Sequence, residues 1–360
     1  MKKLIICKEI KAESFHYYDS YSKDYIYSIG NKVFVSINKI KYEIKLPIKK
    51  RYFFLEKNRI FRRLLRLNMM NIVLNNSKNG LIILYFGAIY FFNFNTKTLT
   101  KTYKIEKCRN VPYNSIAVTK KGIYFGEYRS NKNRDDIKIW CSRDDGLSWS
   151  QIYKLPGIKT RHIHGIYFDK FTKTLWICTG DLNGECYLYN TNEDFSDIRQ
   201  FGDGSQKWRP LSLIFEEKYI IWGMDSNLEI SKLVIFDRET HNINLGKEFP
   251  GPIWYSKQLD EGISLISSAV EIGEGVITKY AYIFYSKNNR DWFPLAKYKK
   301  DYLPMPYFKY GIISFADGNQ TKDDFIIFGE GLIGLDGKSY RGKLMKKIIS
   351  LDSEFIFIDK

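Results

Sequence analysis

The sequence predicts an all-β fold built from repeated four-stranded units, because short apolar or alternating runs recur along its 360 residues. Turn-forming residues separate these runs, as is typical of strands. Groups of four runs repeat roughly every 45 residues. Long helical periodicity is almost absent, and the best short candidate, Arg59–Leu67, fits a pair of strands equally well. A repeat of this length and strand content indicates a β-propeller of four-stranded antiparallel blades.

The strand runs can be grouped into seven units in chain order. In the clearest unit, Ser115–Leu155, the four runs are IAVTK, IYFGEY, IKIWCS and WSQIYKL. The remaining units are predicted at Phe15–Leu46, Leu67–Ile105, Arg161–Phe201, Trp208–Leu245, Gly251–Ala296 and Tyr307–Leu344. These units favour seven blades, with six as the alternative. A further strand within residues 353–359 is expected to close the first blade.

The composition favours one soluble domain. No Pro-rich or Ser-rich linker, charged tail or low-complexity tract divides the chain, so a single domain over residues 1–360 is expected. The 27 Tyr, 25 Phe and 7 Trp suit a large core of strands. Lys and Arg outnumber Asp and Glu by 57 to 40, but no recognition motif accompanies the excess. We therefore expect no specific nucleic-acid partner.

Export and membrane signals are not visible in the sequence. The apolar run Leu4–Cys7 is far shorter than the roughly 7 to 15 residues of a signal-peptide core. No apolar stretch approaches the ~20 residues that span a bilayer. The five cysteines are odd in number and lack paired metal spacing. We expect a cytoplasmic protein with reduced and mostly buried thiols.

The segment CSRDDGLSWSQIY has the pattern S-x-D-x-G-x-x-W at Ser142, Asp144, Gly146 and Trp149. The Asp144 carboxylate can accept backbone N–H groups within a turn, Gly146 can adopt a positive φ, and Trp149 can pack beneath. The segment resembles the Asp-box, or BNR repeat, of sialidase-like β-propellers, and YSKNNRDW resembles a degraded copy. The resemblance implies that the turn joins the third and fourth strands of a blade, opposite the ligand site. It does not extend to the F-R-I-P sequence or the arginine triad of true sialidases, so it implies a fold rather than a reaction.

The strand phases indicate where a ligand site lies. Innermost strands start, and second strands end, on the face opposite the Asp-box turn. Five residues at these positions are candidate catalytic groups: Glu127, His162, His164, Asp181 and Asp225. Others there or in connecting loops are candidate substrate-binding groups: Tyr128, Arg134, Arg161, Gln206, Trp208, Arg209, Glu271, Lys300 and Asp301.

Two of the four histidines stand at i and i+2 in the run RHIHG, so both side chains should point the same way. They fit acid–base or substrate-orienting chemistry, a hydrogen-bonded packing cluster, or metal ligation together with Asp181 or Glu127. No H-E-x-x-H or paired-cysteine spacing supports a metal, so neither a metal nor another cofactor is expected.

The candidate residues together predict a carbohydrate-active enzyme that acts on an acidic or polar glycan. Glycoside hydrolysis is the first expectation, since Glu127 and Asp181 could supply two carboxylates about 5 to 9.5 Å apart. Arginines would bind the substrate charge, and Trp208 would stack on a sugar. The alternatives are a polysaccharide lyase, with a histidine base and Tyr128 as the acid, and a non-catalytic propeller that binds glycans or proteins.

Overall fold

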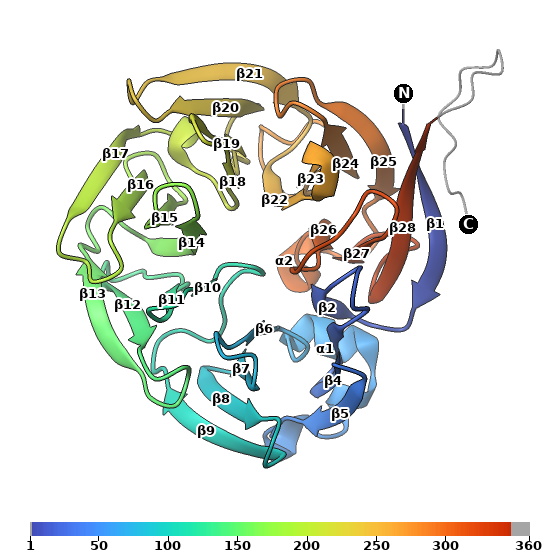
Figure 1. Ribbon diagram of the computed structural model, residues 1–360. Helices are drawn as coiled ribbons and strands as arrows, with labels where there is room; N and C mark the ends of the chain where they lie inside the picture. Colours follow the sequence, from blue (N-terminus) through green and yellow to red (C-terminus); the bar gives the residue numbers. More distant parts are fainter. Residues whose placement is uncertain (1, 347–360) are drawn as a thin grey trace. The chain divides into compact units, whose positions relative to one another are not determined.

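The computed structural model describes residues 2–346 and consists almost entirely of β-strands. The strands form seven four-stranded sheets, coloured in chain order in Figure 1. The chain has the all-β fold of a seven-bladed β-propeller, which confirms seven blades. It divides into two compact units: unit 1 comprises Met1–Asn68, Asn227–Leu233 and Leu245–Lys360, and unit 2 comprises Met69–Ser226 and Val234–Asn244. The expectation of a single domain stays a prediction.

Unit 1 contains the sheet β2–β5, the sheet β22–β25 and a sheet in the order β26-β27-β28-β1. The strands of the first are β2 (Ser14–Tyr18), β3 (Tyr25–Ile29), β4 (Lys32–Ile37) and β5 (Ile40–Lys45). Those of the second are β22 (Ile253–Gln258), β23 (Ser264–Ser268), β24 (Tyr280–Ser286) and β25 (Phe293–Lys299). Those of the third are β26 (Ile312–Phe315), β27 (Phe325–Glu330), β28 (Lys338–Lys346) and β1 (Lys2–Ile10).

The outermost strand of that third sheet comes from the start of the chain. Strand β1 pairs antiparallel with β28, from Lys2 opposite Lys346 to Ile10 opposite Ser339. The unit predicted at residues 307–344 therefore supplies three strands of its sheet, and β1 supplies the fourth. The strand predicted at residues 353–359 lies outside the described residues.

Unit 2 contains three complete sheets in the described chain. The strands of the first are β6 (Met70–Leu74), β7 (Gly80–Tyr85), β8 (Ala88–Asn93) and β9 (Thr98–Lys104). Those of the second are β10 (Ala117–Val118), β11 (Ile123–Gly126), β12 (Ile137–Ser142) and β13 (Ser150–Leu155). Those of the third are β14 (His162–Asp169), β15 (Thr174–Gly180), β16 (Cys186–Thr191) and β17 (Ile198–Gly204). The remaining sheet of the chain contains β18 (Ile214–Phe215), β19 (Tyr219–Gly223), β20 (Ser231–Asp237) and β21 (Ile243–Phe249).

The core of unit 2 consists of apolar strand residues that pack between neighbouring sheets. Phe91 on β8 and Phe125 on β11 belong to one buried cluster, and Ile139 on β12 and Ile163 on β14 belong to the next. Because both faces of these strands are covered, the strands are apolar along most of their length. Their polar residues gather at the strand ends, where the candidate site lies.

Four of the five free cysteines are buried and Cys7 is exposed.

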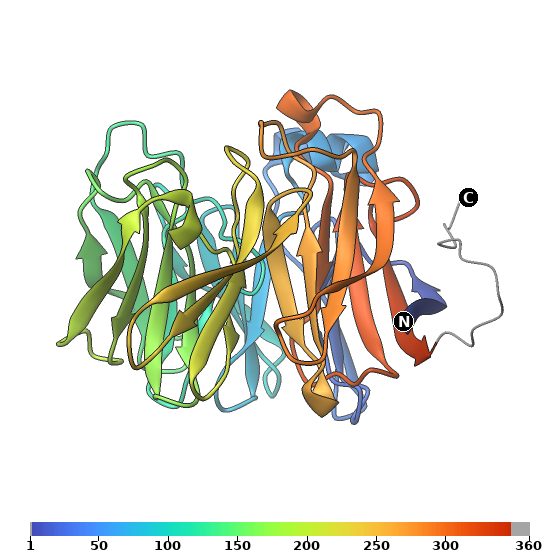
Figure 2. The ribbon, with the colours of Figure 1, turned by 90° about the horizontal axis from the view of Figure 1, so that it is seen from above.

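Helices are few and short. Unit 1 holds α1 (Arg59–Leu65), α2 (Met305–Phe308) and three 3-10 turns, η1 (Lys50–Tyr52), η2 (Leu55–Lys57) and η4 (Asp260–Gly262), while η3 (Gln206–Trp208) lies in unit 2. The segment with ambiguous periodicity is thus helical. The Asn58 side chain accepts a hydrogen bond from Ile60 N at 2.8 Å and caps α1. Figure 2 shows α1 and α2 side by side in unit 1. No helix in the described part of the chain is long and apolar enough to cross a membrane.

Helix α1 is held in unit 1 by ion pairs. Arg62 Nη2 lies 2.6 Å from Glu13 Oε1, and Arg59 Nη2 lies 3.0 Å from Asp336 Oδ1. Arg63, whose side chain is 1% exposed, contacts the Asp301 carboxylate and donates to the Phe308 carbonyl at 3.1 Å. We call the following residues the helix cluster: Glu13, Arg59, Arg62, Arg63, Asp301, Glu330 and Asp336.

Candidate functional site

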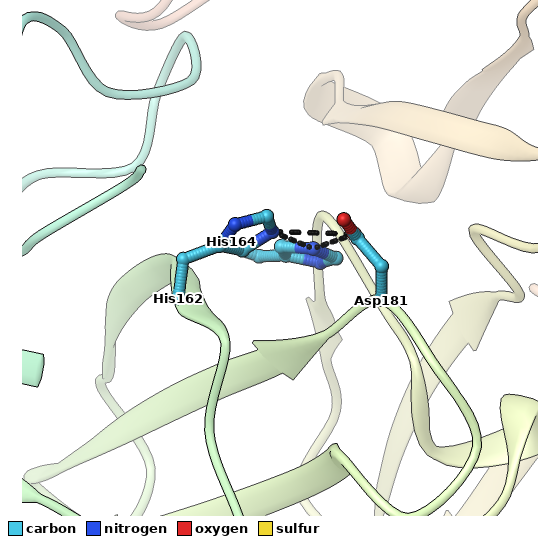
Figure 3. A group of neighbouring side chains, drawn as sticks. All are labelled: His162, His164 and Asp181. Carbon is cyan, nitrogen blue, oxygen red and sulfur yellow. Dashed lines mark hydrogen bonds and ion pairs between the residues drawn. The ribbon is translucent and has the colours of Figure 1, made fainter. Parts of the chain in front are cut away.

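Three predicted site residues meet at one end of the sheet β14–β17. His162 opens β14, His164 follows on the same strand, and Asp181 comes directly after β15. Figure 3 shows the three side chains pointing toward one another. Asp181 Oδ1 lies 3.2 Å from His162 Nε2 and 3.1 Å from His164 Nε2, and the two Nε2 atoms are 3.1 Å apart. We call these three residues the histidine cluster.

A β-bulge brings the two histidines together. Ile163 lies opposite Thr179, whereas Gly165 lies opposite Cys178, so His164 is an extra residue on β14. The ring centroids of His162 and His164 are 5.0 Å apart. The neighbouring Gly180 leaves room for the His164 ring, because a Cβ at this position would lie 2.8 Å from His164 Cε1. The sequence therefore specifies the cluster through both a bulge and a glycine.

Main-chain carbonyl groups fix the hydrogen atoms on both imidazoles. His162 Nδ1 donates to the Arg129 carbonyl at 2.9 Å, and His164 Nδ1 donates to the Pro210 carbonyl at 3.0 Å. Because a carbonyl oxygen can only accept, each Nδ1 carries a hydrogen, and each neutral ring has a lone pair at Nε2. Both Nε2 atoms face the Asp181 carboxylate and each other.

Two guanidinium groups also contact the Asp181 carboxylate. Arg209 Nη2 lies 3.1 Å from Oδ1, and Arg161 Nη1 lies 3.0 Å from Oδ2. Burial acting alone would raise the pKa of Asp181, but positively charged contacts, among them the Arg209 guanidinium, hold that pKa well below its usual range. Asp181 is therefore an ionised carboxylate at neutral pH.

The other arginines near the cluster are shared with carboxylates. Arg134 pairs with Glu185, and Arg209 Nε lies 3.6 Å from Asp225 Oδ2. Arg129 Nε lies 3.4 Å from Glu127 Oε2, and Glu127 Oε1 also accepts from Trp140 Nε1 at 3.2 Å. In this region four arginines and Lys107 thus face five carboxylates: Arg129, Arg134, Arg161, Arg209 and Lys107 against Glu127, Asp135, Asp181, Glu185 and Asp225.

Tyr128 borders the histidine cluster and reaches solvent. The residue is 38% exposed, and its ring centroid lies 4.2 Å from that of His162 and 6.2 Å from that of His164. Tyr128 is the second residue after β11 and directly follows Glu127, as the strand phases predict. A solvent-accessible phenol therefore lies against the buried imidazoles.

Two predicted binding residues, Gln206 and Trp208, support the site from within. Gln206 is fully buried, donates to the Asp181 carbonyl at 3.0 Å and accepts from Arg209 Nη1 at 3.1 Å. Trp208, expected to stack on a sugar, is only 7% exposed and packs 6.0 Å from the Trp222 ring. Its indole lies against Gly202, where a Cβ would come within 2.8 Å of the ring. The expectation of a sugar platform is corrected, because the ring is part of the core.

Three further predicted residues belong to unit 1 and have partners there. Glu271 Oε1 accepts from Trp254 Nε1 at 2.7 Å. Lys300 pairs with Asp301, which also contacts Arg63 in the helix cluster. The charged groups of these three residues therefore have partners within unit 1.

The sequence analysis missed several groups that hold the histidine cluster. Arg129 and Pro210 contribute main-chain carbonyls, and Glu185 pairs with Arg134. Arg129 could have been found, because it directly follows Glu127 and Tyr128 at the end of β11. Carbonyl contacts leave no side-chain pattern and could not be read from the sequence.

The turn after β12 has the hydrogen bonds expected from its sequence. Ser142 Oγ donates to Asp144 Oδ1 and accepts from Gly146 N, both at 2.8 Å. Ser148 N also donates to Asp144 Oδ1 at 2.8 Å, and Gly146 has φ of 104°. Trp149 is buried and its ring centroid lies 5.3 Å from that of Phe125. The turn lies at the end of β12 opposite the Tyr128 loop, because β12 runs from that loop to the turn.

The turn between β24 and β25 repeats part of this arrangement. Asn288 Oδ1 accepts from Arg290 N at 3.0 Å and from Asp291 N at 2.9 Å. Ser286 Oγ lies 3.1 Å from the same oxygen, and Trp292 is buried. An amide oxygen here takes the role that the Asp144 carboxylate has in unit 2.

Comparisons with known proteins identify the fold alone. No protein-family model matches the chain, and no curated protein sequence matches it either. Among solved structures, a chain of the mitotic checkpoint complex matches with a TM-score of 0.58 and 8% identity, over 95% of this chain and 93% of that one. U3-55K matches with a TM-score of 0.53 and 8% identity, over 95% and 98%.

A third match is the extracellular domain of a hybrid two-component system from B. thetaiotaomicron, with a TM-score of 0.57 and 10% identity. It covers 96% of this chain, but this chain spans only 40% of that one. These proteins have unrelated roles, and at such identities the likeness supports the propeller fold and no particular activity.

Proposed function

We propose that unit 2 cleaves an acidic glycan by β-elimination at the histidine cluster. The observation that carries the proposal is the position of Tyr128, whose exposed ring lies 4.2 Å from the His162 ring beside a charged cluster. Elimination next to a uronate requires a group that moves protons and cations that face the sugar carboxylate. Tyr128 provides the first requirement, and Arg161 contributes to the second.

The carboxylates favour elimination over hydrolysis. A glycosidase needs one carboxylic acid that keeps its proton and a second carboxylate that is available to the sugar or to water. Asp181 is instead surrounded by two imidazoles and two guanidinium groups, which lower its pKa. Glu127 is buried and engaged by Trp140 and Arg129. Neither residue is a ready proton donor to a leaving group.

The proposed step uses the residues as follows. Arg161, whose side chain is 31% exposed, faces the uronate carboxylate and stabilises the charge that builds up there. The Tyr128 oxygen takes the proton beside that carboxylate and gives its hydroxyl proton to the leaving oxygen, while the bond to that oxygen breaks and a carbon–carbon double bond forms. Tyr128 is the proton-transfer group. A histidine base is less well supported, because both Nε2 atoms point inward at Asp181.

We also infer that the turn containing Asp144 is an Asp-box and that the chain is related to sialidase-like propellers. The Ser142, Asp144 and Gly146 hydrogen bonds support this inference, as does the partial copy at Asn288. The turn lies away from Tyr128 along β12, so it would serve folding rather than the reaction.

The test is to incubate the purified chain with polygalacturonate, alginate and hyaluronan, and with neutral starch and xylan. Elimination creates an unsaturated uronate that absorbs ultraviolet light, whereas hydrolysis creates new reducing ends without this absorbance. We expect the absorbance to rise with at least one acidic glycan. Reducing ends without absorbance would instead support a hydrolase, and binding without either signal would support a non-catalytic propeller; both results contradict the proposal.

Matched tyrosine variants test the assigned residue. Tyr128→Phe removes only the hydroxyl, and we expect turnover to fall by roughly 10² to 10⁴ with an unchanged melting temperature, since general acid–base groups contribute that much. Tyr153→Phe is the control. Tyr153 lies on β13 in the same unit, and its ring stacks on that of Phe195 with the centroids 5.7 Å apart. Equal turnover in the two variants would exclude Tyr128 from the reaction.

A further inference from the structure

We propose that His162, His164 and Asp181 bind one divalent first-row transition-metal ion through His162 Nε2, His164 Nε2 and Asp181 Oδ1. The proposal departs from the expectation, based on motif spacing, that the chain holds no metal. It stands independently of the reaction proposed above, because it rests on the ligand atoms alone. These three atoms are close enough to share one ion.

The first argument comes from the hydrogen atoms on the rings. Since each Nδ1 donates to a main-chain carbonyl, both neutral rings direct an Nε2 lone pair into the cluster. Three electron-rich atoms then lie 3.1 to 3.2 Å apart with no hydrogen between them. A cation bound by all three atoms satisfies every lone pair at once.

The second argument is geometric. Zinc–nitrogen and zinc–oxygen bonds are about 2.0 to 2.2 Å long, so two ligands at angles between octahedral and tetrahedral values are separated by roughly 2.9 to 3.4 Å. The three distances of 3.1, 3.1 and 3.2 Å fall within that interval. The ligands therefore form one triangular face of a coordination sphere. Three protein ligands leave at least one coordination position for water or a substrate oxygen, as in catalytic metal sites.

The third argument is the outer shell around the ligands. Metal-binding histidines usually donate their second ring N–H to a carbonyl or carboxylate, which fixes the ring orientation and makes the ligand more basic. Both histidines do so here, through the carbonyls of Arg129 and Pro210. Arg161 holds the second Asp181 oxygen, so Oδ1 is directed at the histidines. This arrangement is already complete without any movement of the chain.

A bound ion would change the net charge of this region. The four arginines and Lys107 in this region face five carboxylates, so a bound divalent ion would give the region a net positive charge beside Tyr128. Two imidazoles and one carboxylate suit Zn²⁺, Mn²⁺ or Fe²⁺ better than Mg²⁺ or Ca²⁺, which prefer oxygen ligands. Such a centre would attract an anionic oxygen, including the carboxylate of a uronate.

The experiment is a titration of the chelator-treated full-length chain with Zn²⁺ by isothermal calorimetry, without any glycan. We expect one Zn²⁺ per chain and a rise in melting temperature with Zn²⁺ but not with Mg²⁺. His162→Gln, His164→Gln and Asp181→Asn should each weaken Zn²⁺ binding by about 100-fold or more, beyond the 10- to 100-fold typical of outer-shell changes. His241→Gln is the matched control, because this exposed histidine stacks on Phe236 and should leave binding unchanged.

X-ray absorption of the zinc-bound wild-type chain keeps the test decisive if a ligand variant fails to fold. The expected spectrum has nitrogen and oxygen neighbours with an imidazole pattern and no sulfur. A wild-type chain that binds no stoichiometric Zn²⁺, ligand variants that bind as tightly as His241→Gln, or a sulfur-ligated spectrum would each overturn the proposal. Zinc binding without glycan cleavage would contradict only the proposed function, and cleavage in a metal-free chain would leave the outcome of the titration unaffected.

Discussion

In the helix cluster, three arginines of α1 meet the carboxylates of unit 1, whereas in the histidine cluster two imidazoles meet a single carboxylate oxygen. An arginine carries only hydrogen-bond donors and a carboxylate only acceptors, so the two groups are complementary. A histidine whose Nδ1 already donates has an acceptor left over. The histidine cluster is therefore a set of acceptors directed at one point, which a ligand can satisfy.

The difference shows that the number of charges at the end of a blade does not identify a site. Lys300 and Asp301 are predicted site residues, because they lie in a connecting loop on the face predicted for the site. Asp301 instead pairs with Arg63, which comes from a helix 238 positions earlier in the chain that the repeat pattern does not include. The kind of atom that remains unsatisfied after such pairing is the better indicator of function.

The largest expected effect comes from a comparison of two arginines, Arg63 of the helix cluster and Arg161, which contacts Asp181 of the histidine cluster. Arg63→Met should lower the free energy of unfolding by about 3 to 5 kcal/mol, because it removes a buried guanidinium that pairs with Asp301 and Asp336 and donates to the Phe308 carbonyl. Arg161→Met should cost less than about 1 kcal/mol, since that side chain is partly exposed, yet it should weaken substrate binding. Urea unfolding of both variants measures the contrast. A similar loss of stability in the two variants would break the distinction between a structural and a functional cluster.

Removal of a carboxylate that only accepts hydrogen bonds should have an intermediate effect on stability. Asp144→Ala removes the acceptor for Ser142 and Ser148, and we expect a loss of about 1 to 3 kcal/mol with activity per folded molecule unchanged. Thermal unfolding and a glycan assay on the same samples provide the measurement. Unaltered stability combined with lost ligand binding would show that the turn and the site are not separate.

The smallest effect at neutral pH concerns His16, a buried histidine that lies outside both clusters and pairs with Ser28 Oγ at 2.9 Å. Burial lowers the pKa of His16 to about 3, against about 6.5 in an unfolded chain. The unfolded chain then binds a proton that the folded chain does not, so this contribution is fully present above pH 6.5. It decreases by up to about 1.4 kcal/mol per pH unit as the pH falls toward 3.

His16→Gln keeps a polar group at that position and removes the titration. Urea unfolding at several values between pH 7 and pH 4.5 should therefore give a shallower pH dependence for the variant than for the wild type. Parallel curves would mean that His16 is protonated in the folded chain and that burial alone does not set its state.

Much of the fold could be predicted from the sequence because its determinants are local. Each blade is a run of adjacent strands joined by short turns, so the strand spacing was sufficient to predict seven units. The convergence of His162, His164 and Asp181 followed from strand phase, since the start of β14 and the end of β15 must lie together.

The remaining features depend on contacts between distant residues or on the main chain. The local sequence around Trp208 does not distinguish a ring that faces a ligand from one that faces the core. Contacts with Gly202 and Trp222 determine the orientation of the ring. The bulge at His164 and the carbonyls of Arg129 and Pro210 have no signature in side-chain patterns. The sequence could therefore predict which residues meet, but not which of their atoms face one another.

The pairing of β1 with β28 has a consequence for synthesis in the cell. Lys2 and its partner Lys346 lie at opposite ends of the described chain, so β1 emerges from the ribosome long before its neighbour exists. At translation rates of about 5 to 20 residues per second, the wait lasts on the order of tens of seconds. During that time β1 is an unprotected strand edge, which is open to association with other nascent chains. A molecular chaperone that covers such an edge would increase the yield of the folded protein.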